Sequence, residues 1–130
     1  MKSLSILVAD DVAEIRSLVG GWLGGCGHNV VCASGGIEVA KLLKQRHCDV
    51  VITDILMPDG DGLEVLTELK RTQPWARVLA ISGGGSYLRA TDCLNVAKGF
   101  GAHGVLLKPF NRQQLLDAVS EVAPEPLRDS

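Results

Sequence analysis

Short apolar runs and segments with helical spacing alternate along the whole chain. The runs are rich in Val, Ile and Leu, and they occupy residues 4–9, 29–33, 49–53, 77–81 and 104–107. Near-continuous apolar runs of this length are typical of strands that are buried on both faces of a parallel sheet. The pattern therefore predicts five buried strands.

The segments between the runs have the spacing of amphipathic helices. In the first segment, apolar residues recur three and four positions apart, at Ile15, Leu18, Val19, Trp22 and Leu23. The pair Gly20–Gly21 within this helix predicts close packing on the sheet. Ile37 and Leu43 mark the apolar face of the second helix, residues 87–100 are predicted as the fourth, and Asn111 is the predicted N-cap of the fifth.

Strand–helix alternation of this kind predicts right-handed βαβ units. The expected fold is therefore α/β: a doubly wound, five-stranded parallel sheet flanked by five helices. The length of 130 residues fits one domain, which we place at residues 1–123, followed by a flexible C-terminal tail at residues 124–130 with two prolines.

Charge and composition exclude several classes of protein. Fifteen acidic residues against thirteen basic ones give a net charge of −2, so no direct nucleic-acid binding is expected. No apolar run is long enough for a membrane span, and the start of the chain lacks the features of a signal peptide, so we expect a cytoplasmic protein with no membrane contact. The four cysteines form no CxxC pair and are predicted to be buried, reduced thiols.

Polar residues follow four of the five predicted strands at the point where each strand ends. They are Asp10 and Asp11 after the first, Asp54 after the third, Ser82 after the fourth and Lys108 after the fifth. Because ligands of parallel α/β sheets bind outside the carboxyl ends of the strands, these five side chains are the candidate site.

Three clustered carboxylates need a cation, since two like charges 4 Å apart repel by about 4 kcal/mol at an effective dielectric of 20. Ligation by oxygen alone suits Mg²⁺, with Mn²⁺ as an alternative, rather than zinc. One carboxylate can then act as a nucleophile toward phosphorus, while the ammonium of Lys108 neutralises the transferred oxygens and Ser82 donates a hydrogen bond to them.

The same residues carry a family resemblance. Together with Met57–Pro58, the Asp-Gly-Asp-Gly run at 59–62 and Pro109–Phe110, they resemble the receiver domains of two-component response regulators, of the chemotaxis-regulator type. The resemblance covers residues 4–122 and implies the flavodoxin-like receiver fold.

The resemblance also implies roles for individual residues. Asp54 would accept a phosphoryl group from phosphohistidine. The Mg²⁺ ligands would be Asp10, Asp11, Asp54 and the backbone carbonyl of Leu56. Ser82 would be the switch hydroxyl, and Lys108, joined to Pro109 by a cis bond, would pair with the phosphoryl oxygens. Val105 stands where the family often has Tyr or Phe, which leaves the coupling of the switch open.

Partners follow from the same resemblance. The phosphodonor would be a sensor histidine kinase or a histidine phosphotransfer protein, and the output would be an unidentified downstream protein. The chain would catalyse only its own phosphorylation from the donor and its own dephosphorylation, so we do not expect it to be an enzyme. Met1 and the absence of an effector domain after Val122 leave open whether the chain is a stand-alone regulator or a receiver cut from a longer protein.

Three alternatives belong to other classes. A pseudo-receiver would bind partners without phosphorylation. A Mg²⁺-dependent aspartyl phosphatase would place its nucleophile after the first strand with a second Asp two positions on, whereas Asp10 and Asp11 are adjacent. A flavodoxin-like cofactor binder would need a first loop that attracts phosphate, and this loop is acidic.

Overall fold

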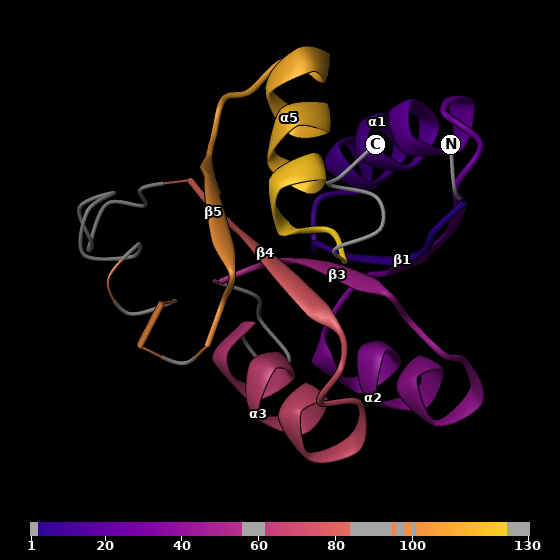
Figure 1. The fold of residues 1–130 in the computed structure, drawn as a ribbon, viewed down its shortest axis with the longest axis vertical. Helices are drawn as coiled ribbons and strands as arrows, with labels where there is room; N and C mark the ends of the chain where they lie inside the picture. Colours follow the sequence, from indigo (N-terminus) through magenta and orange to yellow (C-terminus); the bar gives the residue numbers. More distant parts are fainter. Residues whose placement is uncertain (1–2, 56–61, 84–94, 96–97, 100, 125–130) are drawn as a thin grey trace.

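Five parallel strands form a single sheet in the order β2-β1-β3-β4-β5 (Figure 1). The computed structural model describes residues 3–55, 62–83, 95, 98–99 and 101–124. The strands are β1 (Ser5–Ala9), β2 (Asn29–Ala33), β3 (Val50–Asp54), β4 (Arg77–Ser82) and β5 (Gly104–Leu107). All five agree with the predicted apolar runs to within one residue, and the predicted parallel sheet is confirmed. Burial was predicted for all five strands, but β2 and β5 are only partly buried, because each lies at an edge of the sheet.

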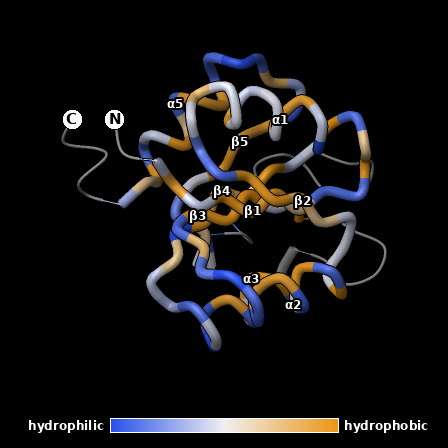
Figure 2. Tube along the Cα trace, turned by 90° about the vertical axis from the view of Figure 1, so that its right-hand side faces the viewer, coloured by the Kyte–Doolittle hydropathy of each residue, from blue (hydrophilic) through white to orange (hydrophobic). Residues whose placement is uncertain are grey.

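Helices cover both faces of the sheet, α1 and α5 on one side and α2 and α3 on the other (Figures 1 and 2). Their bounds are α1 (Ala13–Gly25), α2 (Gly36–Gln45), α3 (Gly62–Thr72) and α5 (Arg112–Val122). Of the predicted fourth helix only Asn95, Lys98 and Gly99 are described, and all three are helical. The predicted tail lies outside the described residues, apart from Pro124. None of the described helices has the length and apolarity needed to cross a membrane.

The two faces of the sheet each carry a hydrophobic core. The apolar residues of the strands themselves are drawn in orange through the middle of Figure 2. Successive side chains of a strand point to opposite faces. In β1, Ile6 and Val8 therefore pack in the cluster under α1 and α5, and Leu7 and Ala9 pack in the cluster over α2 and α3. Because both faces are covered, the central strands need apolar residues at nearly every position, which explains the unbroken runs in the sequence.

Some apolar positions of the predicted helix faces point to solvent. Leu18 of α1 is 48% exposed and Ile37 of α2 is 61% exposed, whereas Val19, Val39 and Leu43 are buried. The predictions for Leu18 and Ile37 were therefore wrong. Helical spacing defines a face of the helix, but the neighbouring sheet decides how wide a stripe of that face it covers.

The glycines of α1 behave in two ways. A Cβ on Gly20 would lie 3.4 Å from Cys32 Sγ, so the predicted close packing on the sheet holds at this position. Gly21 has nothing within 4 Å of a Cβ, so close packing does not account for it, and α1 extends through Gly25.

The described cysteines differ in burial. Cys48 is buried, Cys26 is half-buried and Cys32 is exposed, and all three are free thiols. Burial was wrongly predicted for Cys32, because β2 is an edge strand that the helices cover incompletely. Cys93 lies outside the described residues.

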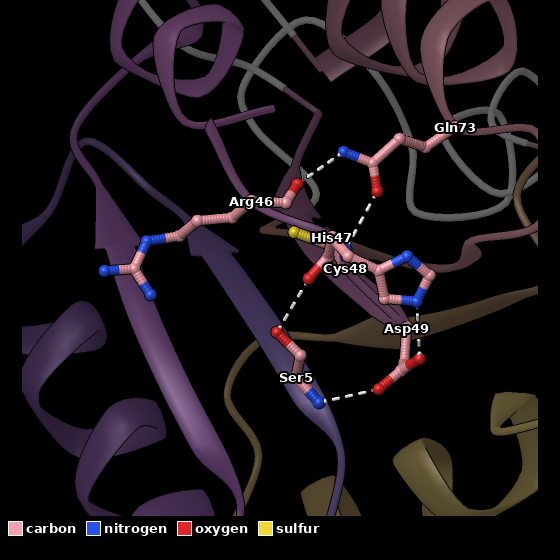
Figure 3. Close-up of polar contacts among 6 residues, drawn as sticks. All are labelled: Ser5, Arg46, His47, Cys48, Asp49 and Gln73. Carbon is pink, nitrogen blue, oxygen red and sulfur yellow. Dashed lines mark hydrogen bonds and ion pairs between the residues drawn. The ribbon is translucent and has the colours of Figure 1, made fainter. Parts of the chain in front are cut away.

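A polar network closes the amino-terminal edge of the sheet (Figure 3). The buried Gln73 side chain accepts a hydrogen bond from the Cys48 amide (2.8 Å) and donates to the carbonyls of Leu43 (2.9 Å) and Arg46 (2.7 Å). One side chain thus satisfies carbonyls at the end of α2 and an amide just before β3. Groups of this kind are costly when buried without a partner.

The same edge carries a second set of contacts. Asp49 Oδ2 accepts from the Ser5 amide (2.8 Å), and Ser5 Oγ donates to the His47 carbonyl (2.9 Å) (Figure 3). The His47 ring stacks on Trp75 with centroids 5.2 Å apart. These bonds join the start of β1 to the turn before β3, so they serve the fold.

Replacement of Gln73 by Ala is expected to lower the free energy of unfolding by about 2–3 kcal/mol, because it leaves buried backbone groups without partners. Urea unfolding followed by circular dichroism measures the loss. Gln45→Ala, at the exposed end of α2, is the matched control and is expected to change stability by less than about 0.5 kcal/mol. Equal losses in the two variants would contradict the capping role of Gln73.

Two histidines accept hydrogen bonds from backbone amides near the same edge, one just before β1 and one in β4. His28 Nδ1 accepts from the Leu4 amide (3.1 Å) and His103 Nδ1 accepts from the Val78 amide (2.9 Å). Burial lowers the pKa of His28. Burial, followed by the charges of Arg77 and Lys70, lowers the pKa of His103. Both rings are neutral acceptors in the folded chain.

A pH dependence of stability follows from these lowered pKa values. The unfolded chain binds more protons than the folded chain below the ordinary histidine pKa of 6.5, so the histidines' contribution is complete above 6.5 and declines as the pH falls toward their folded values. In the double variant His28→Asn/His103→Asn the amide oxygen replaces the acceptor and cannot titrate. We expect a shallower slope of unfolding free energy between pH 7.5 and 5.5 than in the wild type, and identical slopes would refute this account.

Candidate functional site

The carboxyl ends of the strands bring the predicted polar residues to one edge of the sheet. Asp54 ends β3 and pairs in register with Ile81 of β4, and Ser82 pairs with Leu107 of β5. Beyond the strands, the Lys108 amide donates to the Ser82 carbonyl (2.8 Å). The parallel register therefore carries Asp54, Ser82 and Lys108 onto adjoining strand ends, as the sequence predicted.

Lys108 joins two of the aspartates. Its Nζ lies 2.9 Å from Asp54 Oδ2, where it donates a hydrogen bond, and 3.1 Å from Asp10 Oδ2. The Asp10 side chain is fully buried and the Asp54 side chain is 9% exposed. Such charges are stable inside a protein only when paired, so this ammonium makes the cluster possible.

Asp11 completes an acidic cluster. One carboxylate oxygen from each of Asp10, Asp11 and Asp54 lies within 4.8 Å of the others, with Asp11 on the exposed side. Lys108 is the basic group that contacts these carboxyl groups among the described residues, so acidic groups outnumber basic contacts at the cluster.

Asp10 is a buried carboxyl group with an incomplete set of hydrogen bonds. Its Oδ1 accepts from the Val12 amide (2.8 Å), whereas its buried Oδ2 accepts no hydrogen bond within the described residues and faces only the charge of Lys108. Burial raises the pKa of Asp10, and the negative charge of Asp54 adds to this, against the opposing effects of the Val12 amide and Lys108. The carboxylate lacks a ligand on one oxygen.

Lys108 responds in the opposite sense. Burial by itself lowers the pKa of the ammonium, but the hydrogen bond and charge of Asp54, together with the nearby Asp10 carboxylate, outweigh it and raise the pKa. Lys108 therefore stays charged at neutral pH.

The donor set fits a hard divalent cation. Carboxylate oxygens are the ligands that Mg²⁺ and Mn²⁺ prefer, and the buried Asp10 Oδ2 has no hydrogen-bond partner within the described residues. Asp10, Asp11 and Asp54 would hold the ion. The carbonyl of Leu56, the fourth predicted ligand, lies outside the described residues, as do Met57–Pro58 and most of the run at 59–62.

The sequence also singled out a cis bond, a hydroxyl group and an apolar residue at this edge. The Lys108–Pro109 bond is cis, as predicted. Ser82 is buried at the end of β4. Val105, in the place of the family's aromatic residue, is half-buried and packs against the cluster of Ile55 and Ala80, so its small side chain belongs to the core.

One residue at this edge was missed by the sequence analysis. Arg16 Nη1 donates to the backbone carbonyl of Asp10 (2.8 Å). The available signal was a cation near the N-terminus of a helix, where the helix dipole disfavours positive charge and a local partner is expected.

Comparison with known proteins agrees with this geometry. The family model described as the response regulator receiver domain matches residues 6–120. The chain therefore belongs to the response regulator receiver domain family, which confirms the resemblance inferred from the strand-end residues.

Relatives of two sizes are similar to it. The chemotaxis protein CheY of Bacillus subtilis is 31% identical over 117 residues, which cover 89% of this chain and 94% of that protein. The DNA-binding transcriptional regulator NtrC of Rhizobium meliloti is 30% identical over 128 residues, 98% of this chain but 26% of that protein. The chain thus spans about a quarter of the length of this larger relative.

Solved structures give the same two groups. NtrX from Brucella abortus superposes with a TM-score of 0.85 at 32% identity and covers 98% of this chain and 28% of that one. The chemotaxis protein CheY4 of Vibrio cholerae superposes with a TM-score of 0.83 at 28% identity and covers 93% and 99%. The fold is that of a two-component receiver domain.

Replacement of Asp10 by Asn is expected to stabilise the metal-free protein by about 1 kcal/mol, since it removes a buried charge whose neighbours include another carboxylate. In the wild type, added Mg²⁺ is expected to raise the melting temperature by binding only the folded state, and this rise is expected to shrink in Asp10→Asn. Differential scanning calorimetry with EDTA or MgCl₂ measures both effects.

Asp117→Asn is the control for that experiment, because it removes an exposed carboxylate of α5. It is expected to keep the wild-type response to Mg²⁺. A metal-free Asp10→Asn protein that is less stable than the wild type would contradict this prediction. It would show that the ion pair of Asp10 with Lys108 stabilises the fold more than the repulsion between Asp10 and the other carboxylates destabilises it.

Proposed function

We propose that the chain is a phosphorylatable receiver that takes a phosphoryl group on Asp54 in a Mg²⁺-dependent reaction and thereby changes its binding to partner proteins. The observation that carries this proposal is the cluster of three carboxyl groups around Asp54, with Lys108 already bound to the Asp54 carboxylate. The proposal is also supported by the family, because receiver domains of the CheY and NtrC type are typically phosphoacceptors rather than enzymes.

The proposed transfer starts from a phosphohistidine. A carboxylate oxygen of Asp54 attacks the phosphorus, the P–N bond breaks as the new O–P bond forms, and the imidazole nitrogen leaves with the electron pair of the broken bond. The product is an acyl phosphate on Asp54 and a free histidine on the donor. A bound divalent cation would supply the positive charge that the phosphoryl oxygens need beside three carboxylates.

Residues of this chain would divide the remaining work. Asp10 and Asp11, with Asp54 and the carbonyl of Leu56, would hold the cation. The Lys108 ammonium would exchange its ion pair with the Asp54 carboxylate for one with the phosphoryl oxygens. The Ser82 hydroxyl, at the end of the neighbouring strand, would donate a hydrogen bond to the phosphoryl group.

A phosphoryl group adds about 1.5 to 2 negative charges and three acceptor oxygens. Moving a two-state equilibrium from 1:99 to 99:1 takes about 5.5 kcal/mol. Hydrogen bonds from Lys108 and Ser82 to a charged group, each contributing about 1.5–3 kcal/mol, approach that value. Phosphorylation can therefore bias an existing equilibrium toward a state that binds a downstream protein.

The phosphodonor in this proposal is a sensor histidine kinase or a histidine phosphotransfer protein, and the output is a protein partner. The larger relative's printed name describes a DNA-binding regulator, of which this chain matches about a quarter. We therefore assign the signalling switch, rather than contact with nucleic acid, to this chain.

The test is intact-protein mass spectrometry after incubation with acetyl phosphate. A Mg²⁺-dependent gain of about 80 Da, one phosphoryl group, is expected in the wild type and its loss is expected in Asp54→Asn. Asp117→Asn, an exposed carboxylate elsewhere, serves as the matched control and should be labelled like the wild type.

The alternatives predict other outcomes. Labelling that persists in Asp54→Asn would identify another acceptor, and labelling without a divalent cation would exclude the acidic-cluster mechanism. No labelling from acetyl phosphate or from a phosphohistidine protein would favour a pseudo-receiver that binds partners without phosphorylation.

A further inference from the structure

Arg16 is a basic residue in the first turn of a helix, where a positive charge is unfavourable. It is the fourth residue of α1, close to the end where the helix dipole is positive and a cation is disfavoured. Across the described part of the chain it forms no ion pair with a carboxylate. An ion pair therefore does not account for the position of Arg16. The hydrogen bond of its side chain to the Asp10 carbonyl does.

That hydrogen bond fixes the turn that carries two of the proposed cation ligands. Arg16 Nη1 donates to the Asp10 carbonyl (2.8 Å), and the Arg16 amide donates to the Val12 carbonyl (3.2 Å). On its other side the turn is tied to the sheet, where the Asp10 amide donates to the Ala33 carbonyl (3.1 Å). Arg16 thus joins the end of β1 to the start of α1.

The turn has little else to hold it on the helix side. Val12 is the N-cap of α1, and its side chain makes no capping hydrogen bond. Within the turn, Asp10 Oδ1 accepts a hydrogen bond from the Val12 amide, and Asp10 Oδ2 faces the Lys108 ammonium on the sheet side. The Arg16 side chain, which donates to the Asp10 carbonyl, therefore adds a link between this turn and the first turn of α1.

We propose that Arg16 is a positioning residue that holds the Asp10–Val12 turn so that the carboxylates of Asp10 and Asp11 face Asp54, and that it thereby raises the affinity of this edge for a divalent cation. The inference rests on the cation site of the proposed function and adds a residue outside the ligand set. Replacement of a group that orients a metal ligand commonly weakens metal binding by about tenfold or more.

The charge and the hydrogen bond of Arg16 act in opposite directions. A guanidinium beside the cluster repels a divalent cation, so loss of its charge alone would tighten cation binding. Loss of the hydrogen bond loosens the turn and weakens cation binding. The sign of the change in affinity therefore distinguishes positioning from a simple charge effect.

The experiment compares three variants with the wild type. Arg16→Met removes both the charge and the donor, and Arg16→Lys keeps the charge and one donor group. Arg77→Met is the matched control, because Arg77 Nε also donates to a backbone carbonyl, that of Val122 (2.8 Å), at the opposite edge of the sheet. Each protein is titrated with MgCl₂ alone, without a phosphodonor, by isothermal titration calorimetry, and its metal-free stability is measured by urea unfolding in EDTA.

Arg16→Met is expected to weaken Mg²⁺ binding about tenfold, and Arg16→Lys to weaken it less. Arg77→Met is expected to lose metal-free stability and keep the wild-type affinity. If Arg16→Met does not fold, the comparison of Arg16→Lys with the wild type decides the sign.

Unchanged or tighter Mg²⁺ binding in the Arg16 variants would overturn the positioning role while leaving the cation site intact. Equal weakening in Arg77→Met would overturn it as well, because the effect would then be general destabilisation. A wild-type protein that binds no Mg²⁺ would instead overturn the cation site of the proposed function, and the inference with it.

Discussion

The contact of the Lys108 ammonium with two buried carboxylates is the interaction on which this edge of the molecule depends. Asp10 and Asp54 are almost fully removed from water, and their repulsion opposes the packing of β1 beside β3. Lys108 contacts both of them, and Asp11 adds a third carboxyl group to the cluster. The fold therefore tolerates a site that is short of positive charge. A divalent cation would make up this shortage, and the phosphoryl group of the proposed reaction, which adds negative charge, would need that cation.

The two edges of the sheet divide structure from chemistry. At the amino-terminal edge, polar groups are satisfied: Gln73 bonds three backbone groups, and Asp49 bonds the start of β1 (Figure 3). At the carboxyl-terminal edge, Asp10 keeps an oxygen without a hydrogen bond. Incomplete satisfaction at one edge is stable because the opposite edge and the two apolar layers secure the strands.

The accuracy of sequence interpretation differed between elements for physical reasons. The strands were predicted to within one residue, since their apolar runs stand out even in the edge strands β2 and β5, which are only partly buried. Ile37 and Leu18 were misplaced because helical spacing does not tell which residues at the border of a face the sheet covers. Cys32 was expected inside, but its strand lies at the edge of the sheet, and strand order is not visible in one sequence.

The sequence by itself determined the fold class and the residue types at each strand end, because parallel strands must place their carboxyl ends together. Only the tertiary structure decided which of these groups touch. The contact of Lys108 with both Asp10 and Asp54 depends on the order and register of β1, β3, β4 and β5, which join residues far apart in the chain. The bond from Arg16 to the Asp10 carbonyl depends on how α1 leaves the sheet, and backbone carbonyls carry no signature in a sequence.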